Sequence, residues 1–266
     1  MSKGPVIELI PRKGQKKKPA KGAAFFPEPY PNILLLARKK SGKTTIIYNI
    51  IKNCATSDTE VIIFCPTWRK DDSYKHIIHY MNKKKIEHQE FTSLYDGKEN
   101  ILKNFLQDLA AQSHDSGEDS EEDIDIEPIE AITHTMNAEE QKEKRGPRAK
   151  PYTVPEFIFI FDDMRGANRD KAIADLITTN RHYNAMTIVS TQFATDFTPT
   201  AWANLDYTLL FPKLPIERLP LIREALGLAK ISLDDFMRKY AEATEAEHNF
   251  LYIDMDTESM KRNFTD

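Results

Sequence analysis

The sequence predicts an α/β protein whose mostly parallel β-sheet is covered by helices on both faces. Apolar runs of strand length alternate with segments of helical spacing, as in chains that build parallel sheets. These runs are apolar at nearly every position, which is typical of strands buried on both faces. Residues 33–53 also read as a strand, a Ser-Gly-Lys-Thr turn and a helix, in that order.

The expected elements follow from these patterns in chain order. Pro66 ends the second expected strand, and Pro212 ends a later one, because proline cannot donate to a strand ladder. The expected strands are 33–36, 60–65, 86–91, 156–161, 186–191, 207–211 and 250–253. The expected helices are 42–53, 98–112, 169–179, 216–226 and 233–244.

Charge is distributed unevenly along the 266 residues, although the net charge is only −4. Residues 1–24 carry seven Lys or Arg residues and one Glu, which indicates a flexible basic arm. This arm is either a solvated tail, a contact for nucleic acid or a nuclear-import signal. Residues 25–266 are expected to form a single domain.

A second charged segment interrupts that domain at about 114–150. Residues 115–130 contain nine acidic residues and no basic one, and a mixed charged run follows at 139–150. Such a segment cannot bury enough apolar surface to fold alone, so a disordered or loosely held insertion is expected. Because strands are expected on both sides of it, it separates two halves of one sheet.

Cysteine usage and hydropathy bear on the compartment. Cys54 and Cys65 lie in apolar stretches without metal-ligand spacing, as buried thiols do in a reducing compartment. No apolar stretch reaches 18 residues, so no membrane span is expected. The first residues also lack the apolar segment of a signal peptide, so an intracellular protein is expected.

The strand–turn–helix at the start of the domain fits the phosphate-binding pattern G-x-x-x-x-G-K-[ST], with Ala37 in place of the first glycine. Gly42 allows the backbone to approach phosphates, Lys43 would reach the β- and γ-phosphates, and the Thr44 hydroxyl would hold Mg²⁺. The residues expected to bind nucleotide are Arg38, Lys39, Lys40, Ser41, Gly42, Lys43, Thr44 and Thr45.

Polar residues follow two later strands. Asp162 and Asp163 end the strand at 156–161, and Gln192 ends the strand at 186–191. Carboxyl ends of parallel strands share one sheet edge, where ligands bind. Asp162 would hold the Mg²⁺ water shell, Asp163 would orient or activate water, and Gln192 would contact the γ-phosphate or the water. This combination predicts ATP hydrolysis.

An arginine that stabilises transition-state charge often acts across a subunit boundary. Arg181, just before the strand at 186–191, is the candidate for this role. Arg165, Arg169 and Arg223 are its rivals.

Several segments together resemble the poxvirus-type DNA-packaging ATPases, which also occur in other large DNA viruses and in virophages. These enzymes belong to the FtsK–HerA superfamily of P-loop motors. The resemblance covers roughly residues 26–211 and rests on ARKKSGKTT, CPTW, FIFIFDDM, NRHYNAMTIVSTQ and NLDYTLLF. Two residues depart from the superfamily pattern: Ala37 replaces the first glycine, and Asp163 stands where many cellular translocases carry Glu.

This resemblance implies a RecA/FtsK-like P-loop fold and a homo-oligomeric ring. It implies ATP hydrolysis with Mg²⁺ at a Walker A and Walker B site, driving double-stranded DNA of any sequence into a viral capsid. Capsid or portal proteins would be partners, at virion assembly sites in the host cytoplasm or nucleus. Trp68, Arg69 and Lys70 would contact DNA or a neighbouring subunit, or pack locally. The acidic insertion would mask the basic arm, dock a capsid partner or be a passive loop.

The same residues are also compatible with two other functions. The first is a P-loop kinase acting on a nucleoside or another small molecule. The second is a virion assembly factor that binds nucleotide without turnover, because of Ala37 and the short Asp163 side chain.

Overall fold

The computed structural model describes residues 18–115 and 151–265. Its main sheet has eight strands in the order β10-β9-β8-β1-β7-β6-β2-β3. The six strands from β8 to β3 pair in parallel, whereas β9 is antiparallel to β8 and β10 to β9. The strands are β1 (Asn32–Leu36), β2 (Glu60–Phe64), β3 (Glu87–Phe91), β6 (Phe157–Asp162), β7 (Ala185–Thr191), β8 (Tyr207–Leu210), β9 (Leu251–Asp254) and β10 (Met260–Arg262).

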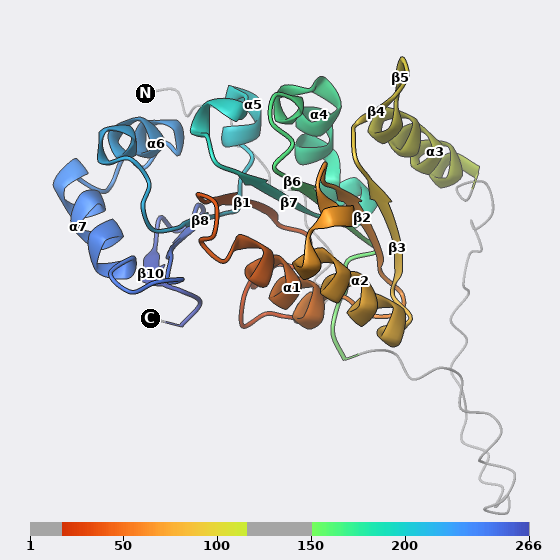
Figure 1. Ribbon diagram of the computed structural model, residues 1–266, viewed down its shortest axis with the longest axis horizontal. Coiled ribbons are helices and arrows are strands. Elements are labelled where there is room, and N and C mark those ends of the chain that lie inside the picture. The colour runs from red at the N-terminus through yellow and green to blue at the C-terminus, as the bar shows by residue number, and fades with distance from the viewer. Residues whose placement is uncertain (1–17, 116–150, 266) are drawn as a thin grey trace, which may run out of the picture.

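Helices cover both faces of this sheet, which confirms the predicted architecture (Figure 1). One face packs against α1 (Lys43–Cys54) and α2 (Asp72–Lys84), whose buried side chains join those of Ile33 and Leu35. The alternate strand residues face the other helices, because successive side chains of a strand point to opposite faces. Those helices are α3 (Ile101–Asp115), α4 (Lys171–Thr179), α5 (Pro199–Trp202), α6 (Leu219–Ala225) and α7 (Leu233–Ala243).

The predicted strands agree with the structure to within one residue at each end, but several other elements differ. Helix α2 was not predicted, although Asp71 caps it by accepting a hydrogen bond from the Ser73 amide at 2.8 Å. A short hairpin of β4 (Tyr95–Asp96) and β5 (Glu99–Asn100) occupies the start of the helix expected at 98–112, so α3 begins later. The helix expected at 216–226 is divided into a 3₁₀ turn and α6. Strand β10 was also missed.

Part of the predicted basic arm is held against the body of the protein. Ala20 forms a parallel bridge with Thr153 and is buried. The Lys21 ammonium donates hydrogen bonds to the carbonyls of Asn53 at 2.9 Å and Ala55 at 2.8 Å, at the end of α1. The prediction of a flexible arm over 1–24 therefore does not hold for residues 18–24, and residues 1–17 lie outside the described part of the chain.

The predicted insertion at 114–150 lies almost wholly outside the described residues, except that α3 continues to Asp115. The described residues contain no helix with the length and apolar character needed to cross a bilayer. Both cysteines are buried, and burial raises the pKa of the Cys54 thiol to about 12, although the nearby Lys21 opposes this shift. The Cys54 thiol is therefore protonated near neutral pH.

The seating of residues 18–24 depends on Gly22, which has a φ of +83°. A β-carbon at this position would lie 2.5 Å from the Cys54 sulfur. Gly22→Ala is therefore expected to lower the free energy of unfolding by about 2–4 kcal/mol, since backbone strain and overpacking add together. Urea denaturation followed by circular dichroism measures this change.

Gly97→Ala is the matched control, because Gly97 has a φ of +59° but no atom within 4 Å of an added β-carbon. This variant is expected to lose only about 1 kcal/mol, from backbone strain alone. Equal losses in the two variants would contradict the packing of Gly22 on Cys54.

Candidate functional site

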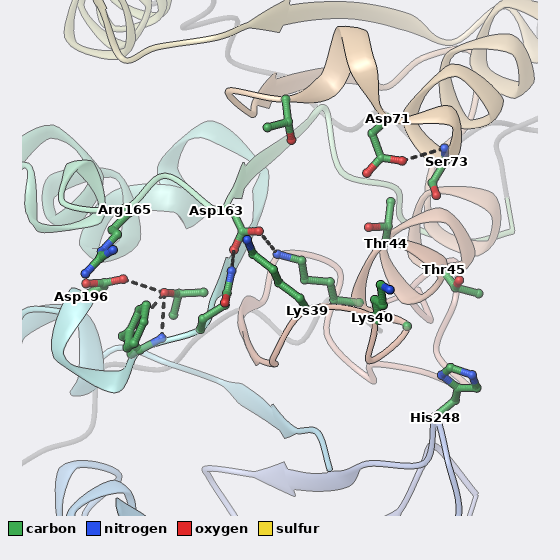
Figure 2. Close-up of a pocket in the computed structure, with 16 residues that line it drawn as sticks. Lys39, Lys40, Thr44, Thr45, Asp71, Ser73, Asp163, Arg165, Asp196 and His248 are labelled. Carbon is green, nitrogen blue, oxygen red and sulfur yellow. Dashed lines mark hydrogen bonds and ion pairs between the residues drawn. The ribbon is translucent and has the colours of Figure 1, made fainter. Parts of the chain in front are cut away.

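The ends of β1, β6 and β7 bring the predicted nucleotide residues to one edge of the sheet. β7 pairs with both β1 and β6 in parallel, so the three carboxyl ends lie side by side. A cavity of about 880 Å³ opens at this edge (Figure 2). The predicted residues that line it are Lys39, Lys40, Gly42, Lys43, Thr44, Thr45, Asp163 and Gln192.

The loop after β1 has the backbone of an anion-binding turn. Lys40 and Gly42 adopt positive φ angles of 64° and 94°, and α1 begins directly at Lys43. No side chain caps the start of α1, so the first amide groups of the helix are left to bind an anion. The Ser41 hydroxyl donates a hydrogen bond within the loop, to the Arg38 carbonyl at 2.7 Å. The Arg38 guanidinium instead donates to the carbonyl of Lys213, after β8, at 3.2 Å.

Ala37 is accommodated without strain in place of the usual glycine. Its φ is not positive, and its amide continues the ladder of β1 by donating to the Thr191 carbonyl at 2.9 Å. Its methyl group is buried in the cluster that packs against α1. The position therefore needs a small residue but not the conformational freedom of glycine.

Lys43 forms the centre of the site. Its Nζ lies 3.1 Å from Asp162 Oδ1 and also forms an ion pair with Asp163 Oδ2. Burial alone would lower the pKa of Lys43, but the two carboxylates outweigh burial, so the pKa is raised and the side chain stays an ammonium. Lys43 Nζ and Asp162 Oδ1 are both buried, and the ion pair between them is a contact of two charged groups shielded from solvent.

Asp163 reaches the same ammonium because its backbone is left-handed, with a φ of 52°. Consecutive residues of a strand normally point to opposite faces, so the turn at Asp163 redirects its carboxylate toward the face of Asp162. Gln192 Nε2 donates a hydrogen bond to Asp163 Oδ1 at 3.2 Å. The two predicted strand ends thus meet in the cavity.

Sequence reasoning missed Tyr74, which orients Asp162 from α2. Its hydroxyl donates a hydrogen bond to Asp162 Oδ2 at 2.9 Å, and both groups are buried. Burial, followed by the charge of Asp162, raises the pKa of Tyr74 well above its ordinary value, so the hydroxyl remains a donor. The available signal was the spacing of Tyr74, Ile77 and Met81 behind the helix-capping Asp71.

The oxygen atoms at the site suit a magnesium ion bound together with phosphate. Among residues 18–115 and 151–265, no group of three or more His, Cys, Asp or Glu residues surrounds a possible metal position. Magnesium bound to a nucleotide needs only one or two protein oxygens, because waters and phosphates supply the rest. The Thr44 hydroxyl and Asp162 Oδ1, which faces the Lys43 ammonium in the described structure, fit this requirement.

A second wall of the cavity contains an arginine that packs on an aromatic ring. The Arg165 guanidinium carbon lies 5.0 Å from the centroid of Phe193, and that of Arg218 lies 5.7 Å from it. Asp196, next to Arg165 in Figure 2, accepts a hydrogen bond from the Thr191 hydroxyl at 2.9 Å. Among the arginines of the described residues, Arg165 is the one that lines this cavity.

Arg181 lies elsewhere, because it precedes β7 and so sits at the amino edge of the sheet. Its guanidinium donates hydrogen bonds to Asp206 at 2.8 Å and to Glu28 at 3.1 Å. Asp206 also accepts a hydrogen bond from the Asn32 amide at 2.7 Å. Arg181 is thus not brought to the cavity of its own chain, and neither of the rivals Arg169 and Arg223 lines that cavity.

The predicted contact segment at Trp68, Arg69 and Lys70 forms a 3₁₀ turn after β2. The Trp68 ring is half-buried against the core, and the Arg69 guanidinium lies 5.2 Å from its centroid. Trp68 thus packs locally, whereas Arg69 and Lys70 are exposed.

Removing the hydroxyl of Tyr74 tests how Asp162 is held. Tyr74→Phe keeps the buried ring but leaves Asp162 Oδ2 without its donor, so the free energy of unfolding is expected to fall by about 1–3 kcal/mol. Guanidinium denaturation of the nucleotide-free protein measures this loss. Tyr80→Phe, on the same helix, is the control and is expected to change stability by less than about 0.5 kcal/mol. A Tyr74→Phe variant as stable as the control would exclude this hydrogen bond as a stabilising contact.

The amino-edge contacts predict a pH-dependent effect of Arg181→Ala. Burial raises the pKa of Asp206, while the Asn32 amide and Arg181 oppose this shift, so the ionised carboxylate destabilises the fold as pH rises through its folded pKa. Loss of Arg181, which is 60% exposed, is expected to remove about 1 kcal/mol at pH 7. The loss should shrink as the pH falls through the raised folded-state pKa of Asp206, because the carboxylate then becomes protonated.

Urea denaturation of wild type and variant at a series of pH values measures this difference. Lys171→Ala is the control, because it removes the more exposed Lys171–Asp175 pair. It is expected to change stability by less than about 0.5 kcal/mol. An Arg181→Ala effect of equal size at pH 4 and pH 7 would contradict the link to Asp206.

Comparisons with known proteins support the fold and only the fold. No model of a protein family matches the sequence, and no curated protein matches it significantly. The structure of the genome packaging NTPase B204 from Sulfolobus turreted icosahedral virus 2 in complex with AMP is similar, with a TM-score of 0.51 and 16% identity. The match covers 89% of this chain and 98% of that one.

The complex of the same NTPase with ATP-gammaS gives a TM-score of 0.50 at 17% identity, over 89% of this chain and 98% of that one. The cytoplasmic domain of the type VII secretion ATPase EccC from Thermomonospora curvata gives a TM-score of 0.52 at 10% identity, over 88% of this chain and 25% of that one. The predicted resemblance to viral packaging ATPases is therefore confirmed at the level of the fold: this chain has the α/β fold of the P-loop genome-packaging NTPases.

Proposed function

We propose that this protein is an ATPase whose ATP hydrolysis drives double-stranded DNA into a viral capsid. The observation that carries the enzymatic part is the meeting of Lys43, Asp162, Asp163 and Gln192 at one edge of the sheet. The packaging part is supported by the motifs and by the fold shared with the B204 NTPase.

Binding of a triphosphate would use the start of α1 and Lys43. The uncapped amides of α1 and the ammonium of Lys43 offer positive charge to the phosphates in a largely buried setting. The ammonium is shared between two carboxylates in the described structure, and a phosphate would compete for it. Thr44 and Asp162 would hold a magnesium ion, which neutralises charge on the phosphate oxygens.

Asp163 would then orient the attacking water. Gln192 occupies one carboxylate oxygen of Asp163, and Lys43 pairs with the other. When Lys43 turns to the phosphates, Asp163 Oδ2 becomes free to accept a hydrogen bond from water. The left-handed backbone at Asp163 turns its carboxylate into the cavity, which offsets the shorter reach of Asp compared with Glu.

The arginine that stabilises transition-state charge has two candidates under this proposal. Arg165 lines the cavity of its own chain and lies on the side of Asp163 and Asp196 (Figure 2). Arg181 lies at the opposite edge, so any such role would be played in the site of a neighbouring subunit. A homo-oligomeric ring, capsid or portal partners and action at virion assembly sites belong to the same proposal.

ATP hydrolysis measured with and without linear double-stranded DNA tests the function. Wild type is expected to hydrolyse ATP in the presence of Mg²⁺ and to do so faster with DNA of any sequence. Lys43→Ala is expected to lower the rate by at least about 100-fold, because it removes the charge that contacts the β- and γ-phosphates. Lys52→Ala, on the exposed side of α1, is the matched control and should hydrolyse like wild type.

The same assay separates the other functions. Transfer of the phosphoryl group to a nucleoside would indicate a kinase and would contradict the proposed DNA-packaging ATPase. Nucleotide binding without hydrolysis, even when DNA and capsid proteins are added, would favour an assembly factor. A rate of ATP hydrolysis that is the same with and without DNA would support an ATPase but contradict coupling to DNA translocation.

A further inference from the structure

The antiparallel strand β9 brings a distant segment to the phosphate loop. Leu251, the first residue of β9, pairs with Leu210, the last residue of β8, which itself pairs with Leu36 at the end of β1. The chain between α7 and β9 therefore arrives at the carboxyl edge of the parallel strands. Its residue His248 lines the cavity.

His248 packs directly on the phosphate loop. A β-carbon placed on Gly42 would lie 3.2 Å from His248 Nδ1, so the imidazole covers the bare Cα of this glycine. Nδ1 lies 3.4 Å from the Ser41 carbonyl oxygen, at the long end for a hydrogen bond. Figure 2 shows His248 on the side of Thr45, with Arg165 and Asp196 on the opposite side of the cavity.

The backbone holds His248 in an unfavourable conformation. Its φ is 68°, in the left-handed region that non-glycine residues adopt uncommonly. The next residues fix this turn, because the Asn263 side chain donates to Asn249 Oδ1 at 3.0 Å and accepts from the Phe250 amide at 3.1 Å. The imidazole itself is exposed, so burial of the ring does not compensate for the strained backbone. Such strain is often found where a side chain must be presented to a ligand.

The other residues of the cavity fix the direction in which a triphosphate would lie. Asp163 and Gln192 mark the end where the terminal phosphate would react, and Lys43 lies beside them. The nucleoside must then extend the other way, along the start of α1 past Thr45. His248 stands at that end (Figure 2).

We propose that the imidazole of His248 is the stacking surface for the base of the bound nucleotide, and that this site takes purine nucleoside triphosphates without distinguishing adenine from guanine. This inference rests on the proposed function and adds its substrate class. A purine offers the larger ring for stacking, and stacking does not depend on the base edge. Lys40, in the loop before α1, and Thr45, in the first turn of α1, lie on the same side of the cavity as His248 (Figure 2).

Equilibrium binding by calorimetry, with Mg²⁺ present, tests this assignment without requiring turnover. The probes are AMPPNP, GMPPNP and inorganic tripolyphosphate. Wild type is expected to bind the two nucleotides with affinities within about threefold of each other. His248→Ala should weaken both nucleotides by about tenfold, the effect of losing one stacked base, and tripolyphosphate by less than about twofold. His248→Phe should restore nucleotide binding, since it keeps a flat ring.

His182→Ala, at the amino edge of the sheet, is the matched control and should bind all three probes like wild type. Equal weakening of nucleotide and tripolyphosphate in His248→Ala would show that His248 only supports the loop, which overturns the assignment. Unchanged nucleotide binding in that variant, or a failure of His248→Phe to restore it, would also overturn it. A preference of wild type for one purine above tenfold would overturn the shared substrate class. Failure of wild type to bind any probe would instead refute the proposed function itself.

Discussion

The ion pairs of buried Lys43 with buried Asp162 and with the partly exposed Asp163 are the interaction on which the rest of the site depends. A charged group buried without a partner costs several kcal/mol, so the buried Lys43 and Asp162 side chains each require a partner of opposite charge. Their meeting fixes the start of α1 against the end of β6. The hydrogen bond from Tyr74 adds α2 to the same arrangement, so two helices and a strand are held at one point.

Much of the fold could be predicted from the sequence, for a physical reason. The central strands are buried on both faces, so their runs are mostly apolar, and they end near polar residues, as at Asp162 and Gln192. Helix α2 and strands β4, β5 and β10 lack this pattern, since they are short or carry many polar residues. Their existence depends on packing that a local pattern does not contain.

The site could be predicted where the sequence marks the carboxyl end of a strand, and not elsewhere. Lys43, Asp163 and Gln192 follow strands and do meet. Arg181 precedes β7 and so lies at the amino edge of the sheet, although it is close in sequence to Gln192 at the carboxyl edge. Tyr74 lies in α2, and His248 lies just before the antiparallel strand β9. Both reach the site only because of tertiary contacts, which a local sequence pattern does not contain. Ala37 shows that alanine can replace the first glycine of the phosphate-binding pattern, because the backbone at this position is not left-handed.

Asp162 divides its two carboxylate oxygens between different partners: Oδ1 faces Lys43 and Oδ2 accepts from Tyr74. The second contact does not involve any group that a phosphate or a metal would displace. Oδ1 can therefore exchange one positively charged neighbour for another while Oδ2 stays anchored. A catalytic cycle built on this carboxylate would change the local charge without moving the end of β6, so repeated turnover need not disturb the core beneath it.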